Sequence, residues 1–320
     1  MATSTTRDDS MMTNNSESGL SRRRLLKCSA WAGAGVIWTV AGGIPRATGF
    51  GFGSSAEAAA SGFSFVQISD SHIGFNKAPN PDAAATFTEA VGKISSMSTK
   101  PAFLIHTGDV SQLAKPEQFD TAAQIIKGAG LDVHYVPGEH DVINDDGKEF
   151  FSRFSPNSKG WYSFDANGVH FIALVNVLGF KAGGYGHLGD EQLAWLAADL
   201  KPLSASTPLV IFTHIPMWLV YADWGWGTDD SAQVMSLVKS FGSVTVLNGH
   251  IHQIIQKVEG NVAFHTADST AFPQPAPGTA PNPGPMKVEA TKLKSLLGIT
   301  NVTVVAGTAP LALTDMPLSA

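Results

Sequence analysis

The sequence predicts one α/β domain of about 260 residues, preceded by a segment of about 60 residues that does not resemble folded protein. Of the 320 residues, 43% are hydrophobic and 15% are charged, which suffices to bury a sizeable core and argues against a disordered or collagen-like chain. Beyond Ser61, short apolar runs rich in Val, Ile and Phe alternate with helical stretches. This alternation is typical of a sheet covered by helices.

The expected elements follow in chain order. Strands are predicted where apolar residues run almost without interruption, as in the interior of a sheet: residues 63–68, 103–105, 133–136, 169–177, 209–212 and 244–247. Helices are predicted from apolar residues at helical spacing: residues 82–97, 117–129, 191–200 and 231–241. Asp190 and Asp230 are expected to cap the last two helices.

A proline-rich segment divides this core from a C-terminal extension. Residues 271–285 contain six prolines, which exclude a helix or an interior strand and favour an extended strap. A helix at 288–297, ending at Gly298, and short edge strands at 302–305 and 311–314 are expected after it. We therefore expect three parts: residues 1–60, residues 61–270, and an extension of residues 271–320 packed on the core.

The N-terminal segment resembles a twin-arginine export signal. Residues 21–27 read Ser-Arg-Arg-Arg-Leu-Leu-Lys, a weakly apolar stretch follows at 29–44, and small residues at 56–60 suit a signal peptidase. The resemblance implies cleavage, the twin-arginine machinery as a partner, and a bacterial periplasmic location. A permanent membrane anchor is the less favoured alternative, because the apolar stretch has only 16 residues and four of them are glycine.

Charge and cysteine content exclude several classes of protein. After residue 60 the chain carries 15 Lys and Arg against 23 Asp and Glu, and this acidic balance argues against general nucleic-acid binding. The single cysteine, Cys28, lies in the predicted signal, so the folded domain has no disulfide and no thiolate ligand or nucleophile. The sequence predicts no oligomeric state.

Side chains that bind metals follow five of the predicted strands. They occur in the order Asp70-Ser71-His72, Gly108-Asp109, Gly138-Glu139-His140-Asp141, His214 and Gly249-His250-Ile251-His252. Because ligands gather beyond the carboxyl ends of strands in α/β sheets, we expect these groups to converge although they span 182 positions. The glycines before Asp109, Glu139 and His250 are expected to allow unusual φ angles in sharp turns.

The order and the residue types of these motifs resemble those of the calcineurin-like metallophosphoesterase superfamily, over about residues 63–270. The resemblance implies a four-layer αββα sandwich with a dinuclear metal site at the carboxyl ends of the strands. It assigns Asp70, His72 and His252 to the first metal and His214 and His250 to the second. Asp109 would bridge the two metals, and Glu139 stands where the family usually has an asparagine ligand to the second metal.

The implied activity is phosphoester hydrolysis by in-line attack of a metal-bridging hydroxide. Carboxylate and imidazole ligands suit two divalent or mixed-valence ions of Fe, Mn or Zn. His140 is the expected catalytic residue, stabilising the phosphoryl oxygens or protonating the leaving group, and Asp141 is expected to support the loop or a ligating imidazole. Asp70-Ser71-His72 and the compact spacing resemble cyclic-nucleotide and glycerophosphodiester phosphodiesterases, so a phosphodiesterase acting on a small-molecule phosphoester is expected. The resemblance does not identify the substrate.

Glu139 leaves two alternatives open. A carboxylate in place of an amide adds negative charge and favours a harder or higher-valent metal, so a metal-dependent redox (iron and oxygen) or metal-binding protein on the same scaffold is the competing hypothesis. Alternatively, Glu139 points away from the metals and water replaces it.

Other candidate residues are less specific. The aromatic loop 217–226 either stacks on a substrate or packs on the core. The histidines outside the motifs are expected to be structural: His106, His134, His170, His187 and His265.

Overall fold

The computed structural model describes residues 36–41, 44–49, 62–181, 184–304 and 311–319. The predicted twin-arginine motif at 21–27 and cleavage region at 56–60 lie outside these residues. Within residues 1–60, strands β1 (Val36–Ala41) and β2 (Ile44–Gly49) pair as an antiparallel hairpin. Residues 61–320 form a separate compact unit. No helix in the described part of the chain is long and apolar enough to cross a membrane.

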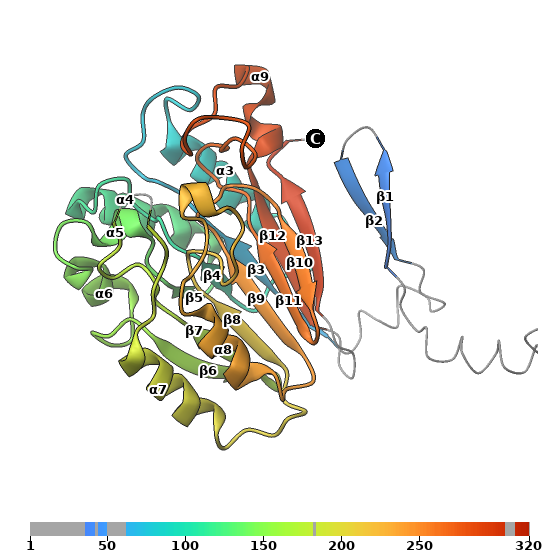
Figure 1. Cartoon of the computed structure of the whole chain (residues 1–320). Helices are drawn as coiled ribbons and strands as arrows, with labels where there is room; N and C mark the ends of the chain where they lie inside the picture. Colours follow the sequence, from blue (N-terminus) through green and yellow to red (C-terminus); the bar gives the residue numbers. More distant parts are fainter. Residues whose placement is uncertain (1–35, 42–43, 50–61, 182–183, 305–310, 320) are drawn as a thin grey trace, which may run out of the picture. The chain divides into compact units, whose positions relative to one another are not determined.

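Two mixed sheets form the centre of the compact unit (Figure 1). The five-stranded sheet has the order β13-β12-β3-β4-β5; its strands are β3 (Phe63–Ile68), β4 (Leu104–His106), β5 (Val133–Tyr135), β12 (Gly298–Val304) and β13 (Ala312–Pro317). The six-stranded sheet has the order β10-β11-β9-β8-β7-β6; its strands are β6 (Tyr162–Ala166), β7 (Val169–Ala173), β8 (Leu209–Phe212), β9 (Val244–Asn248), β10 (Gln256–Glu259) and β11 (Val262–Thr266). Strands β3, β4 and β5 run parallel in one sheet, and β7, β8, β9 and β11 run parallel in the other.

The helices are α3 (Ala83–Ser95), α4 (Pro116–Ile126), α5 (Glu139–Val142), α6 (Lys148–Phe154), α7 (Asp190–Leu200), α8 (Ser231–Val238) and α9 (Ala290–Leu293). Short 3₁₀ helices cover Lys127–Ala129, Ala222–Trp224 and Lys294–Leu296. Apolar residues of α3, α4 and α6 pack on the five-stranded sheet, and those of α7 and α8 pack on the six-stranded sheet.

Alternation along β3 explains the layers. Phe65 faces a core shared with Phe171 and Phe212 of the other sheet, whereas Val66 and Ile68 face the helices on the opposite side. Successive strand residues point to opposite faces, so a strand that is apolar throughout can serve both layers. Each fully buried side chain of this size contributes about 1.5–3 kcal/mol of transfer free energy. The predicted four-layer αββα sandwich is confirmed.

Several predicted elements differ from the structure. The strand predicted at 169–177 ends at Ala173, because the backbone of Val175 pairs with the Gln192 side chain instead of a neighbouring strand. The helix predicted at 288–297 is reduced to α9 and a 3₁₀ turn, and Gly298 begins β12 instead of ending a helix. Strand β12 lies between β13 and β3, so of these two C-terminal strands β13 is an edge strand and β12 is not.

Of the two predicted helix caps, Asp190 is wrong, whereas Asp230 occupies the N-cap position of α8 without a side-chain cap bond. Asp190 is the first residue of α7, whose cap is Gly189. The Asp230 carboxylate does not cap α8; it accepts hydrogen bonds from the backbone N–H groups of Leu188 (3.0 Å) and Gly189 (2.9 Å), before α7. Asp230 therefore ties the two helices together at their N-terminal ends.

Candidate metal centre

Five of the predicted ligands have left-handed backbone conformations. The φ angles are positive at Asp70 (51°), His72 (40°), Asp109 (52°), His250 (70°) and His252 (52°). Such conformations cost about 1–3 kcal/mol each for residues other than glycine, although Asp and His tolerate them better than most. Hydrogen bonds between the loops offset this cost, including Asp70 N to Gly108 O (3.0 Å) and His72 N to Asp109 O (2.8 Å). The sharp turns direct all five side chains into one cluster.

The neighbouring glycines are required mainly for space. We expected Gly108, Gly138 and Gly249 to supply unusual φ angles, but only Gly108 has a positive φ (98°). A Cβ atom on Gly138 would lie 2.0 Å from Asp109 Oδ1, and a Cβ atom on Gly249 would lie 2.1 Å from Ser69 Oγ. These two glycines let the ligand loops approach each other closely.

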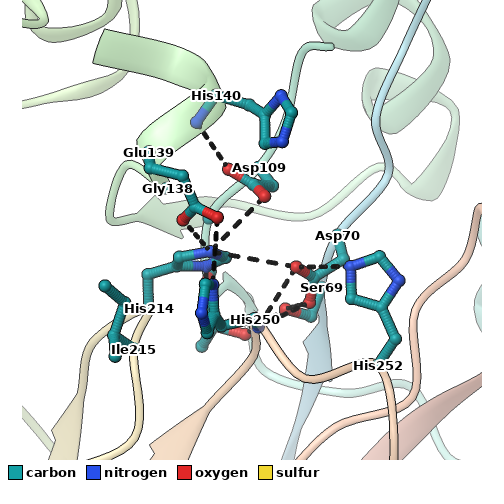
Figure 2. Close-up of polar contacts among 12 residues, drawn as sticks. Ser69, Asp70, Asp109, Gly138, Glu139, His140, His214, Ile215, His250 and His252 are labelled. Carbon is teal, nitrogen blue, oxygen red and sulfur yellow. Dashed lines mark hydrogen bonds and ion pairs between the residues drawn. The ribbon is translucent and has the colours of Figure 1, made fainter. Parts of the chain in front are cut away.

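The seven predicted metal ligands lie together and include two three-residue groups, Asp70-His72-His252 and Glu139-His214-His250. Figure 2 labels all of them except His72. In the first group, His252 Nε2 lies 3.3 Å from Asp70 Oδ1 and 3.2 Å from His72 Nε2. In the second group, Glu139 lies between two imidazoles. Its Oε2 is 2.9 Å from His214 Nε2, and its Oε1 is 3.0 Å from His250 Nδ1. The alternative in which Glu139 points away from the cluster is therefore wrong.

Asp109 joins the two groups. Its Oδ2 lies 3.4 Å from His72 Nε2 and 3.5 Å from His214 Nε2. Its other oxygen, Oδ1, accepts a hydrogen bond from the backbone N–H of His140 (3.0 Å). One carboxylate oxygen thus faces an imidazole from each group, which is the arrangement that a bridging ligand requires.

Backbone carbonyls orient two of the imidazoles. His214 Nδ1 donates a hydrogen bond to the Thr107 carbonyl (2.7 Å), and His252 Nδ1 donates to the Phe272 carbonyl (2.6 Å). Because a carbonyl only accepts, each Nδ1 carries the proton. When such a ring is neutral it presents an Nε2 lone pair to the cluster, which is how histidine ligands are usually held. In the metal-free cluster burial lowers the pKa of His214, but Asp109 and Glu139 outweigh burial and raise this pKa well above its ordinary value, so a cation at Nε2 would displace a proton.

The donor atoms fit a pair of cations. His214 Nε2, His250 Nδ1 and Glu139 Oε2 are buried, and their contacts at 2.9 and 3.0 Å do not have hydrogen-bond geometry. A buried polar atom without a partner costs about 1–3 kcal/mol, and a cation would satisfy all three atoms. Imidazole and carboxylate donors suit Mn, Fe or Zn.

Electrostatics also favour a cation at this site. Burial opposes ionisation of Glu139, but His250 and His214 outweigh it and hold the pKa of the carboxyl well below its ordinary value. Burial lowers the pKa of His72 to about 3, which keeps the imidazole neutral and able to bind a metal. Two further buried carboxylates, Asp70 and Asp109, also have lowered pKa values, in both cases because nearby histidines outweigh burial.

His140, the predicted catalytic residue, lies beside the cluster but outside the two groups. Its ring centre is 4.8 Å from that of His72, and its Nδ1 donates to the Gln112 carbonyl (2.8 Å). Burial lowers the pKa of His140, but the charges of Asp109 and Glu139 outweigh it and raise the pKa above its ordinary value. A protonated His140 can donate a proton or stabilise negative charge.

Asp141 connects two of the ligand loops. Its carboxylate accepts hydrogen bonds from the backbone N–H groups of Val110 (3.0 Å), Ser111 (2.8 Å) and Gly138 (3.0 Å). These contacts hold the loop that carries Asp109 against the loop that carries Glu139. Of the two predicted roles for Asp141, the structure favours loop support.

The aromatic loop packs on the core. Trp218, Trp224 and Trp226 are buried, and the last two pack against Ile251, which lies between His250 and His252. Their rings support the ligand loop and offer no open face for stacking. The packing alternative is therefore favoured over the substrate-stacking alternative.

Other apolar side chains lie near residues of the cluster in the chain or in space, and the sequence analysis missed them. Leu113 is 44% exposed and directly follows Gln112, which contacts His140. Ile143 is 54% exposed and lies at the C-terminal end of α5, the helix that carries His140. Beside the second group, the Phe180 ring centre lies 6.2 Å from that of His250. An exposed Leu or Phe in a loop is too common to be recognised from sequence alone.

Comparison with known proteins identifies the family. Residues 63–254 match the model of the calcineurin-like phosphoesterase family, so the chain belongs to this family. It is 25% identical to a 3′,5′-cyclic-nucleotide phosphodiesterase of Nostoc sp., over 65% of this chain and 79% of that protein. It is 23% identical to a probable glycerophosphodiester phosphodiesterase of Arcobacter nitrofigilis, over 64% and 77%. The protein is a metal-dependent phosphoric ester hydrolase, as predicted.

A solved structure supports the fold. A dimetal phosphatase from Danio rerio superimposes with a TM-score of 0.60 at 14% identity, covering 81% of this chain and 97% of that one. At this identity the likeness shows the fold alone. The predicted family and the predicted need for divalent metal ions are confirmed.

Proposed function

We propose that this protein is an exported phosphodiesterase that uses two metal ions. One observation carries the proposal: Asp109 Oδ2 lies between two three-residue groups of candidate ligands. It is 3.4 Å from His72 Nε2 in the first group and 3.5 Å from His214 Nε2 in the second. Relatives named as cyclic-nucleotide and glycerophosphodiester phosphodiesterases favour a diester over a monoester. The seven ligands predicted from the sequence are the residues that we assign to the two ions.

The chain's own residues have distinct tasks in this proposal. A bound pair of metal ions supplies Lewis acidity and a nucleophile at neutral pH. Asp70, His72 and His252 would hold one ion, Glu139, His214 and His250 would hold the other, and Asp109 would contact both. His140 lies within 4.8 Å of ligand atoms of His72 and Asp109 but is assigned to neither ion; it would bind a phosphoryl oxygen or protonate the leaving group.

The surroundings of the cluster favour a diester with apolar groups. We infer that Leu113 and Ile143 lie on the leaving-group side, because both are exposed and neighbour in the chain Gln112, which contacts His140, and helix α5, which carries His140. The Phe180 ring centre lies 6.2 Å from that of His250. Replacing both Leu113 and Ile143 by Ser should lower kcat/KM for an aryl phosphodiester about tenfold. Turnover of dimethyl phosphate, from which methoxide must depart, should change less. Equal losses for both reactions would contradict this assignment.

Export is proposed from the N-terminal sequence. Residues 21–27 match the pattern of a twin-arginine signal, which directs folded proteins across the bacterial inner membrane. The proposed location is therefore the periplasm, and the proposed partner is the twin-arginine machinery. N-terminal sequencing of the secreted protein tests cleavage near residues 56–60.

The competing function is metal-dependent redox chemistry, favoured by the carboxylate of Glu139 between His214 and His250. The deciding experiment purifies the protein with its native metal, counts the ions, and assays bis(p-nitrophenyl) phosphate alongside oxygen consumption. Diester turnover that is abolished by Asp109→Asn supports the phosphodiesterase. Oxygen-linked activity without ester turnover in the presence of Mn, Fe or Zn supports the competitor.

A further inference from the structure

Residues 269–274, which we call the C-terminal clamp, lie directly against the first group of ligands. The clamp follows strand β11 and opens the proline-rich strap, beyond the end of the family match at residue 254. The Ser269 hydroxyl donates to the Asp70 carbonyl (2.7 Å) and accepts hydrogen bonds from the backbone N–H groups of Ala271 (2.8 Å) and Phe272 (3.1 Å). One buried hydroxyl therefore joins a ligand's backbone to the turn of the clamp.

Phe272 contacts two further ligands of the same group. Its carbonyl accepts the His252 Nδ1 proton at 2.6 Å. Its ring centre lies 4.6 Å from that of His252 and 4.8 Å from that of His72. The ring is buried and packs at 4.4 Å against Phe75. Backbone and ring together fix both the tautomer and the orientation of His252.

The clamp is itself held in place from several directions. Asn80 donates to the Ala271 carbonyl (2.7 Å), and the Gln274 amide donates to the His250 carbonyl (2.8 Å). Farther along the strap, Gly284 N donates to Gln274 Oε1 (2.9 Å). The six prolines of the strap reduce the entropy that is lost when it orders. Because the clamp is preorganised, little conformational entropy is lost in holding it in the orientation that the ligands require.

The clamp makes more contacts with the first group of ligands than with the second. Asp70, His72 and His252 all contact the clamp through side chain or backbone, whereas the hydrogen bond between the clamp and His250 is made by the His250 carbonyl. Among the described contacts, His214 is oriented instead by the Thr107 carbonyl, on the loop after β4. The two groups thus depend on different parts of the chain.

We propose that Ser269 and Phe272 are positioning residues for the first metal ion, so that the C-terminal extension sets the affinity of one site and leaves the other unchanged. This inference rests on the two-metal function proposed above. In this proposal the start of the strap determines the metal affinity of one site, although the strap lies outside the matched family region.

The test uses the full chain with Ser269→Ala and Phe272→Leu. Metal-free protein is titrated with Zn²⁺ against a chelating dye, which resolves two successive affinities. We expect both variants to lose about 10–100-fold in one affinity, as is typical when an outer partner of a ligand is removed, and to keep the other. Matched controls are Phe241→Leu, in the core between α8 and the six-stranded sheet, and Ser163→Ala, whose hydroxyl binds Asp199.

Thermal unfolding of the metal-free proteins separates positioning from general damage. If Phe272→Leu and Phe241→Leu lower the unfolding midpoint equally, only a positioning role explains a loss of affinity confined to Phe272→Leu. Unchanged affinities in both clamp variants, or equal losses at both sites, would overturn the proposal. If the wild-type protein binds a single ion, the two-metal function fails. In that case the affinity for the single ion is compared, and an unchanged affinity in both Ser269→Ala and Phe272→Leu overturns the proposed role of the clamp.

Discussion

Replacing Gly138 with Ala tests how closely the ligand loops must approach. Gly138 has a φ angle of −97°, which alanine adopts without strain. The added Cβ would lie 2.0 Å from Asp109 Oδ1 and 2.4 Å from Asp109 N. Carbon and oxygen atoms in contact are normally about 3.5 Å apart, so the loops must separate by more than about 1 Å. Any effect of the substitution therefore comes from displaced contacts and not from backbone strain at residue 138.

The expected loss is large because Asp109 faces both groups. A misplacement of about 1 Å can lower a rate by about 100-fold, equivalent to about 2.7 kcal/mol in the barrier. We expect kcat for bis(p-nitrophenyl) phosphate to fall by about this factor in Gly138→Ala. Both metal affinities should fall as well, since Asp109 Oδ2 lies near an imidazole of each group.

Gly92→Ala is the matched control. Gly92 lies in α3, and an added Cβ there would meet nothing within 4 Å. This substitution should raise stability by about 0.5–1 kcal/mol and leave turnover unchanged. The reasoning would be refuted if Gly138→Ala kept turnover and both affinities within about threefold of wild type, or if Gly92→Ala lost activity to the same degree.

Three further predictions concern charge, pH and export. Glu139→Asn removes one negative charge beside the substrate and should keep or raise kcat/KM for an anionic diester; a loss as large as that of Asp109→Asn would contradict this. Hydrogen bonding to Asp199 outweighs burial and raises the pKa of His170. The protonated His170 therefore stabilises the folded protein fully below about pH 6.5, and this stabilisation is lost as the pH rises through the folded-state pKa. His170→Gln should therefore lower the unfolding midpoint more at pH 5.5 than at pH 9, and an equal loss at both would refute the linkage. Replacing Arg22 and Arg23 together by Lys should retain the protein in the cytoplasm, and fractionation that finds it in the periplasm would refute the signal assignment.

Buried strands were the easiest elements to predict from the sequence. Runs such as 63–68 and 209–212 are apolar throughout because both faces are covered, and the structure places strands there. Strand β10 (Gln256–Glu259) was missed because it is a polar edge strand with little burial. Helix α6 was missed because it has only seven residues and begins after Gly147 in a left-handed conformation.

The candidate ligands were predictable, but their local geometry was not. Motif order placed the seven ligands at strand ends, and the topology of two facing sheets brings those ends together. The sequence did not show that Asp and His residues, more than the glycines beside them, adopt left-handed conformations. It also left open whether the strap covers the site or braces the sheet, because the contact between Phe272 and His252 depends on tertiary structure.

The most direct test of the account is a crystal structure of the protein with its native metals, with anomalous scattering measured at the metal edges. The account predicts two ions, one among Asp70, His72 and His252 and the other among Glu139, His214 and His250, both in contact with Asp109. A single ion, or two ions that Asp109 does not bridge, would contradict it.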